Sequence, residues 1–209
     1  SIMKKLLILL FSLFFLVSPS VIADDISDFS IEGVSIGDSL LDYVTKEEIL
    51  KEIELSKDMY FYLNPPDKYS EVYLFKNLQK YDAISFFVRN SASSEYIINK
   101  NNKYKILYVR GMMPYIEDFD GCIKERDKIS EELSKMFPNI DKKSSFSASP
   151  SDPSGNSFND GIWFYFDSGD AISVHCSDWE ETFRIKNNWK EGLNISIRSK
   201  EVDDWLRDY

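Results

Sequence analysis

Residues 162–176, IWFYFDSGDAISVHC, have the pattern of a β-hairpin. Two runs rich in apolar side chains flank Asp167-Ser168-Gly169, a three-residue loop whose glycine suits the left-handed backbone position. This loop pairs Phe164 with Ile172 and Ile162 with Val174. A two-residue loop would shift the register by one residue and turn three large apolar side chains outward. The three-residue loop therefore gives the more consistent core.

The hairpin also predicts on which face of the sheet Cys176, one of the two cysteines, lies. Side chains alternate between the faces of a strand, so Cys176 shares the apolar face with Ile172 and Val174. His175, the single histidine of the chain, points to the opposite face together with Ala171 and Ser173.

The second cysteine, Cys122, lies in a predicted helix that Asp118 or Asp120 caps and that runs to Phe137. Its inward-facing stripe is Cys122, Ile129, Leu133 and Met136. A helix packed on the apolar face of the hairpin brings the two sulfur atoms together. Oxidising compartments convert such pairs into disulfides, so the sequence predicts a disulfide between Cys122 and Cys176.

The same residues raise two other hypotheses, a zinc site formed by both thiols with His175 and a nucleophile formed by a cysteine with His175. Both need Cys176 and His175 to converge on one atom. Adjacent strand residues point to opposite faces, which favours the disulfide. No metal site and no cofactor are predicted.

The remaining chain predicts further helices and strands. A capping-box pattern at Thr45 and Glu48 begins a helix to about Leu55, with Ile49, Leu50 and Ile53 facing inward. A strand with one buried face carries Leu193, Ile195 and Ile197. A short terminal helix has an apolar stripe of Val202, Trp205, Leu206 and Tyr209. Further strands are predicted at Tyr60–Leu63, Val72–Lys76, Tyr81–Arg89, Tyr96–Ile98 and Tyr104–Arg110.

We predict a single α+β domain over residues 24–209, an antiparallel sheet with helices packed on one face. Residues 141–159, DKKSSFSASPSDPSGNSFN, are predicted as a Ser/Pro-rich loop with room for a short strand around Phe146. The order of helix, strands, helix and strands hints at a weak internal duplication.

Residues 1–23 have the three parts of a cleavable signal peptide. Met3-Lys4-Lys5 is a basic start, residues 6–17 (LLILLFSLFFLV) are an apolar run shorter than a bilayer span, and Val21-Ile22-Ala23 is a small-residue cleavage site. The sequence therefore predicts export to the periplasm or the extracellular medium.

Charge excludes two classes of partner. The leader holds two of the 25 basic residues and none of the 35 acidic ones, so its removal takes the formal charge from −10 to −12. Such a surface repels phosphate backbones and anionic lipid, so we expect neither nucleic-acid binding nor membrane binding after cleavage of the leader.

The signatures H-E-x-x-H and the Gly-rich nucleotide loops do not occur in the sequence. The short pattern G-x-S-x-G occurs once, at Gly33-Val34-Ser35-Ile36-Gly37, and S-x-x-K occurs once, at Ser1-Ile2-Met3-Lys4 in the predicted leader. Asp118-Phe119-Asp120-Gly121 resembles part of a calcium loop, but Ile116 stands at the first ligand position, so a helix cap is expected. No catalytic residue is predicted. Paired carboxylates for a hydrolase stay open, because the chain has many acids.

One surface is a candidate for binding. The predicted register places Trp163, Tyr165 and His175 on the outer face of the hairpin, where they could bind a protein or a sugar. The alternative is that the Ser-rich loop or the end of the chain covers them.

Four phrases, IEGVSIGDSLLDYVTKEEI, GCIKERDKISEEL, FDSGDAISVHCSDW and LNISIRSKEVDDWL, resemble a group of short exported proteins of unassigned function from marine alphaproteobacteria. The resemblance implies a bacterial periplasmic origin and transfers no active site.

The expected function is therefore that of an exported, non-catalytic module that binds another envelope protein or a small ligand. The alternative is a carboxylate-based periplasmic hydrolase. A purely structural envelope protein is the third reading of the same sequence.

Overall fold

A computed structural model describes residues 26–59, 63, 68–90 and 103–208. The predicted leader, the strand at Tyr96–Ile98, most of the strand at Tyr60–Leu63 and the terminal Tyr209 lie outside the described residues. No helix in the described ranges combines the length and the apolar character that crossing a bilayer requires.

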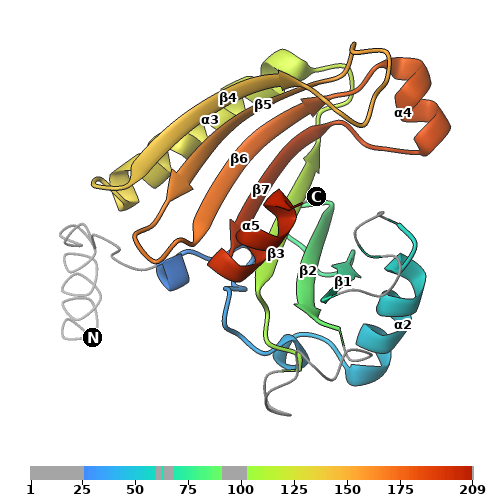
Figure 1. The fold of residues 1–209 in the computed structure, drawn as a ribbon, viewed down its shortest axis with the longest axis vertical. Coiled ribbons are helices and arrows are strands. Elements are labelled where there is room, and N and C mark those ends of the chain that lie inside the picture. The colour runs from blue at the N-terminus through green and yellow to red at the C-terminus, as the bar shows by residue number, and fades with distance from the viewer. Residues whose placement is uncertain (1–25, 60–62, 64–67, 91–102, 209) are drawn as a thin grey trace, which may run out of the picture.

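The described residues form one antiparallel sheet in the order β1-β2-β3-β7-β6-β5-β4 (Figure 1). Its strands are β1 (Tyr69–Leu74), β2 (Ala83–Arg89), β3 (Tyr108–Pro114), β4 (Asp141–Ala148), β5 (Phe158–Tyr165), β6 (Ala171–Asp178) and β7 (Gly192–Arg198). Helix α2 (Lys46–Ser56) precedes β1 to β3, and α3 (Phe119–Met136) precedes β4 to β7. This helix-then-strands order occurs twice, and the last strands of the two units, β3 and β7, pair at the centre of the sheet.

The hairpin of β5 and β6 has the predicted register, Phe164 opposite Ile172 and Ile162 opposite Val174. Gly169 takes a φ of 87°, and the amide of Phe166 donates to the carbonyl of Asp170 to close the three-residue loop. The prediction from the hairpin sequence is confirmed, and its register sets which side chains face the core.

The main core lies on the sheet face that carries Ile172, Val174 and Cys176, called here the core face. Helix α3 packs on this face, and Ile49 of α2 joins the same buried cluster. Asp118 caps α3 by accepting from the amide of Gly121 at 3.0 Å, as the sequence predicts. The cluster includes the expected α3 residues Cys122, Ile129 and Leu133, with Met136 packed at its edge.

The disulfide between Cys122 and Cys176 is formed, with the two Cα atoms 6.0 Å apart and both residues fully buried. An ion pair beside the disulfide joins α3 to the neighbouring strand β5. Arg126, one turn after Cys122, contacts Asp160, the cross-strand partner of Cys176. Helix α3 is therefore held to the sheet by a covalent bond and by a half-buried ion pair beside it.

The capping box at the start of α2 is confirmed, since the Thr45 side chain accepts from the amide of Glu48 and Glu48 accepts from that of Thr45. The inward direction predicted for Leu50 is wrong, because this residue is 44% exposed. Ile49 and Ile53 form the buried side of the helix, so α2 packs through a narrower stripe than the sequence suggested.

The prediction that helices occupy one face of the sheet is wrong for the last helix, α5 (Lys200–Arg207). Val202 of α5 lies in a second apolar cluster with Tyr69, Phe87 and Tyr108, against which Trp205 packs. These three aromatic residues belong to the face opposite the core face, called here the polar face, and Figure 1 shows α5 in front of the sheet with α3 behind it.

The strand that the sequence allowed around Phe146 is present and longer than expected, because β4 pairs with β5 along its whole length. The loop predicted over 141–159 is therefore wrong in its first half. All eight residues of β4 are exposed, so no apolar alternation marks the strand in the sequence. Pairing with the amphipathic β5 creates this strand. Lys142 and Lys143 lie on the strand at the edge of the described sheet, where lysines discourage further pairing.

Strand β3 begins four residues later than predicted, at Tyr108 instead of Tyr104. The segment before it pairs with the N-terminal region, where the amide of Leu40 donates to the carbonyl of Tyr104 and the amide of Ile106 to that of Asp38. The strand continues through Gly111, where the ring of Tyr81 would lie 2.6 Å from an added Cβ. A glycine at this position lets the ring cover the strand.

The sequence analysis did not predict α4 (Glu181–Asn187), a short helix in the connection between β6 and β7. Around it Trp179, Phe183 and Trp189 contact one another in tilted and edge-to-face arrangements, with ring centroids 4.8 to 6.0 Å apart.

Loss of the disulfide should destabilise the fold strongly. Closure of a loop of 54 residues is worth about 4 kcal/mol in the chain-entropy model, so Cys122→Ala/Cys176→Ala should lower the free energy of unfolding in urea by about that amount. Wild-type protein that has been reduced under denaturing conditions and refolded should lose the same free energy of unfolding in urea. Because both cysteines are buried, native protein should resist a mild reductant. Thiols that alkylate in the native, unreduced protein would contradict the prediction.

Candidate functional site

The polar face of the hairpin holds the residues that the sequence singled out for binding. Cross-strand pairing places Trp163 of β5 beside Ser173 of β6, and Ser173 beside Ser196 of β7. Both serines are buried, and their hydroxyl groups lie 2.7 Å apart. The floor beside Trp163 is therefore made of small polar side chains.

Trp163, Tyr165 and His175 form a row of nearly parallel rings on this floor. The centroid of Trp163 lies 6.4 Å from that of Tyr165 and 6.5 Å from that of His175, with ring planes within 12°. All three residues are half-buried. The Trp163 indole donates to the hydroxyl of Ser145 at 3.3 Å, and a Cβ at Gly161 would lie 3.3 Å from this indole nitrogen. We call these three residues the aromatic row.

Arg198 anchors one side of the aromatic row. Its guanidinium carbon lies 4.2 Å from the centroid of the Trp163 ring, and the group donates to the hydroxyl of Ser173. Asp203 of α5 completes the arrangement with an ion pair to Arg198 at 3.2 Å. The Nε atom of Arg198 is buried and has no hydrogen-bond partner among the described residues.

The end of the chain covers only part of the aromatic row. Asp170, next to the hairpin loop, accepts from the amide of Lys200 at 2.7 Å and so fixes the start of α5. Arg207 of α5 lies 5.6 Å from the ring centroid of Tyr165, and Lys143 of β4 lies 5.1 Å from the same centroid. In Figure 1 no described helix lies in front of β4 and β5, whereas α3 lies behind them.

A second buried ionic group extends the polar face and was missed in the sequence. Glu71 of β1 is fully buried and pairs with Arg110 of β3 at 2.8 Å, while Arg110 also bonds Tyr73 and Ser85. Burial raises the pKa of Glu71, and Arg110 opposes that shift. Glu71 lies before the predicted start of its strand, so no alternation pointed to it.

His175 is uncharged at neutral pH. Burial, followed by the positive charges of Arg198 and Arg110, lowers the pKa of its imidazole to about 3. Its Nδ1 atom is buried without a hydrogen-bond partner in the described structure. A neutral imidazole can both donate and accept a hydrogen bond, which suits it to a ligand that carries hydroxyl groups.

The zinc and nucleophile hypotheses do not fit this geometry. Both thiols are consumed in the disulfide, and Cys176 belongs to the core face while His175 lies on the polar face. What the arrangement provides chemically is a flat aromatic surface flanked by guanidinium groups and by serine hydroxyls.

Comparison with known proteins adds no relative to this picture: no family model, no curated protein and no solved structure matches the chain.

Titration of His175 should show the buried environment directly. Its resonance is the only histidine signal in the proton spectrum, and it should not titrate between about pH 5 and 8. In the unfolded chain the imidazole of His175 takes up a proton near pH 6.5, whereas in the folded state it stays uncharged at that pH. Stability should therefore fall as the pH drops from about 6.5 towards 3, by up to roughly 1.4 kcal/mol per pH unit from this group.

His175→Gln should remove that part of the pH dependence and leave the contribution of the carboxylates, as measured by urea unfolding at several pH values. A histidine resonance with a midpoint near the ordinary pKa would contradict the assignment.

Proposed function

We propose that the protein is an exported, non-catalytic binding module that uses the aromatic row of Trp163, Tyr165 and His175 to bind another envelope protein or a small ligand. The observation that carries this proposal is a row of nearly parallel, half-buried rings on the part of the polar face that α5 does not close. Tyrosine and tryptophan in such positions offer a large apolar surface together with a polar group.

Rigidity supports the same function. The Ser145 hydroxyl holds the indole of Trp163, and Arg198 holds its ring face, while Asp203 and Ser173 hold Arg198 itself. A surface whose side chains are already fixed loses little conformational entropy when a partner binds.

The charged side chains around the aromatic row can bond polar groups of a partner at its rim. Arg198, Arg207 and Lys143 gather around the aromatic row, although the chain has ten more acidic than basic residues. Asp203 pairs with both arginines and Asp141 pairs with Lys143, so the row is flanked by ion pairs and not by free positive charge.

Export to the periplasm or the medium is part of the proposal. It is supported by the features of residues 1–23 and by a buried disulfide, a bond that persists in oxidising compartments. The resemblance to exported alphaproteobacterial proteins points to the same origin.

A carboxylate-based hydrolase is the alternative. Asp178 and Glu191 are one pair of described acids that interact, since burial and then Glu191 raise the pKa of Asp178. Glu191, however, accepts from the amide of Glu117 and pairs with Arg184 at 3.7 Å. Because these bonds already engage one acid of the pair, we rank hydrolysis behind binding.

Removal of the aromatic row should abolish binding. Periplasmic extract and its small-molecule fraction would be passed over immobilised wild type, Trp163→Ala/Tyr165→Ala and the control Ile185→Ala, which removes an exposed apolar side chain of α4. Molecules retained by wild type and control should bind the double variant at least about 30-fold more weakly, because central aromatic contacts are worth 2 kcal/mol or more. Equal retention by the double variant would refute the proposal.

Export can be tested separately. Expressed in a Gram-negative host with its own leader, the protein should be recovered from the periplasmic fraction or the medium, with Asp24 as its first residue by N-terminal sequencing. Recovery of uncleaved chain from the cytoplasm would contradict export. The binding proposal would be unaffected by that result.

A further inference from the structure

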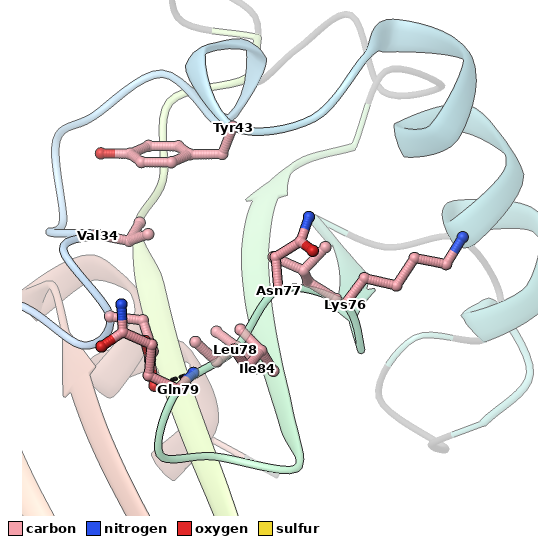
Figure 2. A pocket seen from close by; sticks show the side chains of 9 residues that line it. Val34, Tyr43, Lys76, Asn77, Leu78, Gln79 and Ile84 are labelled. Carbon is pink, nitrogen blue, oxygen red and sulfur yellow. Dashed lines mark hydrogen bonds between the residues drawn. The ribbon is translucent and has the colours of Figure 1, made fainter.

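A pocket of about 230 Å³ lies away from the aromatic row, between the N-terminal segment and the turn that joins β1 to β2. Figure 2 shows the Tyr43 ring on one side of it and Leu78 and Ile84 on the opposite side. Its lining consists of Glu32, Val34, Tyr43, Leu74, Lys76, Asn77, Leu78, Gln79 and Ile84.

Tyr43 is an exposed side chain that is nevertheless held in place. The residue is 41% exposed, yet its hydroxyl donates to the carboxylate of Asp38 at 2.7 Å and lies 3.3 Å from the carbonyl oxygen of Gly33. Asp38 is fixed in turn by the amide of Ser35 at 3.0 Å. An exposed tyrosine is ordinarily free to change rotamer, so these bonds preserve an open aromatic wall.

The opposite wall is apolar and equally fixed. Ile84 is fully buried and Val34 nearly so, while Leu74 and Leu78 are half-buried beside them. The carboxylate of Glu32 accepts from the amides of Gln79 and Lys80 at 3.1 and 2.6 Å, which holds the turn against the N-terminal segment.

Two residues of the lining have left-handed backbone conformations that side chains rarely adopt. Glu32 has a φ of 52° and Asn77 a φ of 61°. Such conformations persist where surrounding contacts enforce them, and they concentrate at functional sites. At the rim, the amides of Asn77 and Gln79 provide hydrogen-bond donors and acceptors.

The electrostatics of the pocket disfavour an anion. Burial, followed by the carboxylates of Asp38 and Asp42, raises the pKa of Tyr43 to about 12. Lys76 does not offset these charges inside the pocket, because its side chain runs towards α2 in Figure 2 and its charge acts on Glu48.

We propose that this pocket binds a small aromatic molecule without negative charge, whose ring packs between Tyr43 and the wall of Leu78 and Ile84 and whose polar group bonds the amides of Asn77 or Gln79. Offset stacking on Tyr43 and burial against apolar side chains supply the attraction. The site is separate from the aromatic row, so it stands or falls independently of the proposed function.

Indole is a suitable probe, with an aromatic ring and one N–H donor. In a nitrogen–proton correlation spectrum, indole should shift the side-chain amides of Asn77 and Gln79 and the backbone amide of Lys80, with a Kd on the order of 1 mM for so small a ligand. Indole-3-acetate, which adds a carboxylate, should bind about threefold more weakly or worse.

Tyr43→Ala should abolish these shifts. Leu41→Ala is the matched control, because Leu41 is 46% exposed in the same short turn and does not line the pocket. Leu78→Gln, which makes the opposite wall polar, should weaken indole binding as well. This variant replaces Tyr43→Ala in the test if Tyr43→Ala is poorly folded. The proposal would be overturned if the wild-type spectrum showed no shift at about 5 mM indole, several times the expected Kd. It would also be overturned if Tyr43→Ala and Leu78→Gln both bound indole as tightly as wild type. Binding of indole-3-acetate as tight as that of indole would overturn it too.

Discussion

The covalent bond between Cys122 and Cys176 is the constraint on which the rest of this structure depends. It ties α3 to one face of the sheet and so decides which side of β6 is the core. Since neighbouring strand residues face opposite ways, fixing Cys176 towards α3 sends His175 to the polar face. The register of the hairpin then carries Trp163 and Tyr165 to that same face. The candidate binding surface is in this sense a consequence of the disulfide.

The polar face shows how a sheet accommodates charge away from water. Arg110 with Glu71, and Arg198 with Asp203, are pairs in which each buried charge has an opposite partner. Unpaired buried charges would cost several kcal/mol each, so the partners are required for folding and they position the aromatic row as well. Arg89 and Glu201 add a bidentate contact that holds α5 over the aromatic residues of β1 and β2. The helix that closes one half of this face thus leaves the other half open.

The aromatic row and the pocket beside Tyr43 share one physical feature. In both, a partly exposed aromatic ring is held by hydrogen bonds to polar groups that are themselves fixed, Ser145 for Trp163 and Asp38 for Tyr43. Exposed rings held in this way keep their apolar surface available at little entropic cost. This feature distinguishes the two sites from exposed apolar residues such as Ile185.

Local patterns in the sequence were sufficient for the hairpin register, the cap of α3, the capping box of α2 and the pairing of the cysteines. Each depends on residues within one turn or one strand, or on the only two thiols in the chain. The sequence allowed a short strand around Phe146 but could not show the full extent of β4, because its residues are exposed and pairing with β5 creates the strand. Nor could it show that α5 crosses to the polar face, that Glu71 meets Arg110, or that Tyr43 closes a pocket. Those contacts join residues far apart in the chain, and only the packing of the whole sheet brings them together.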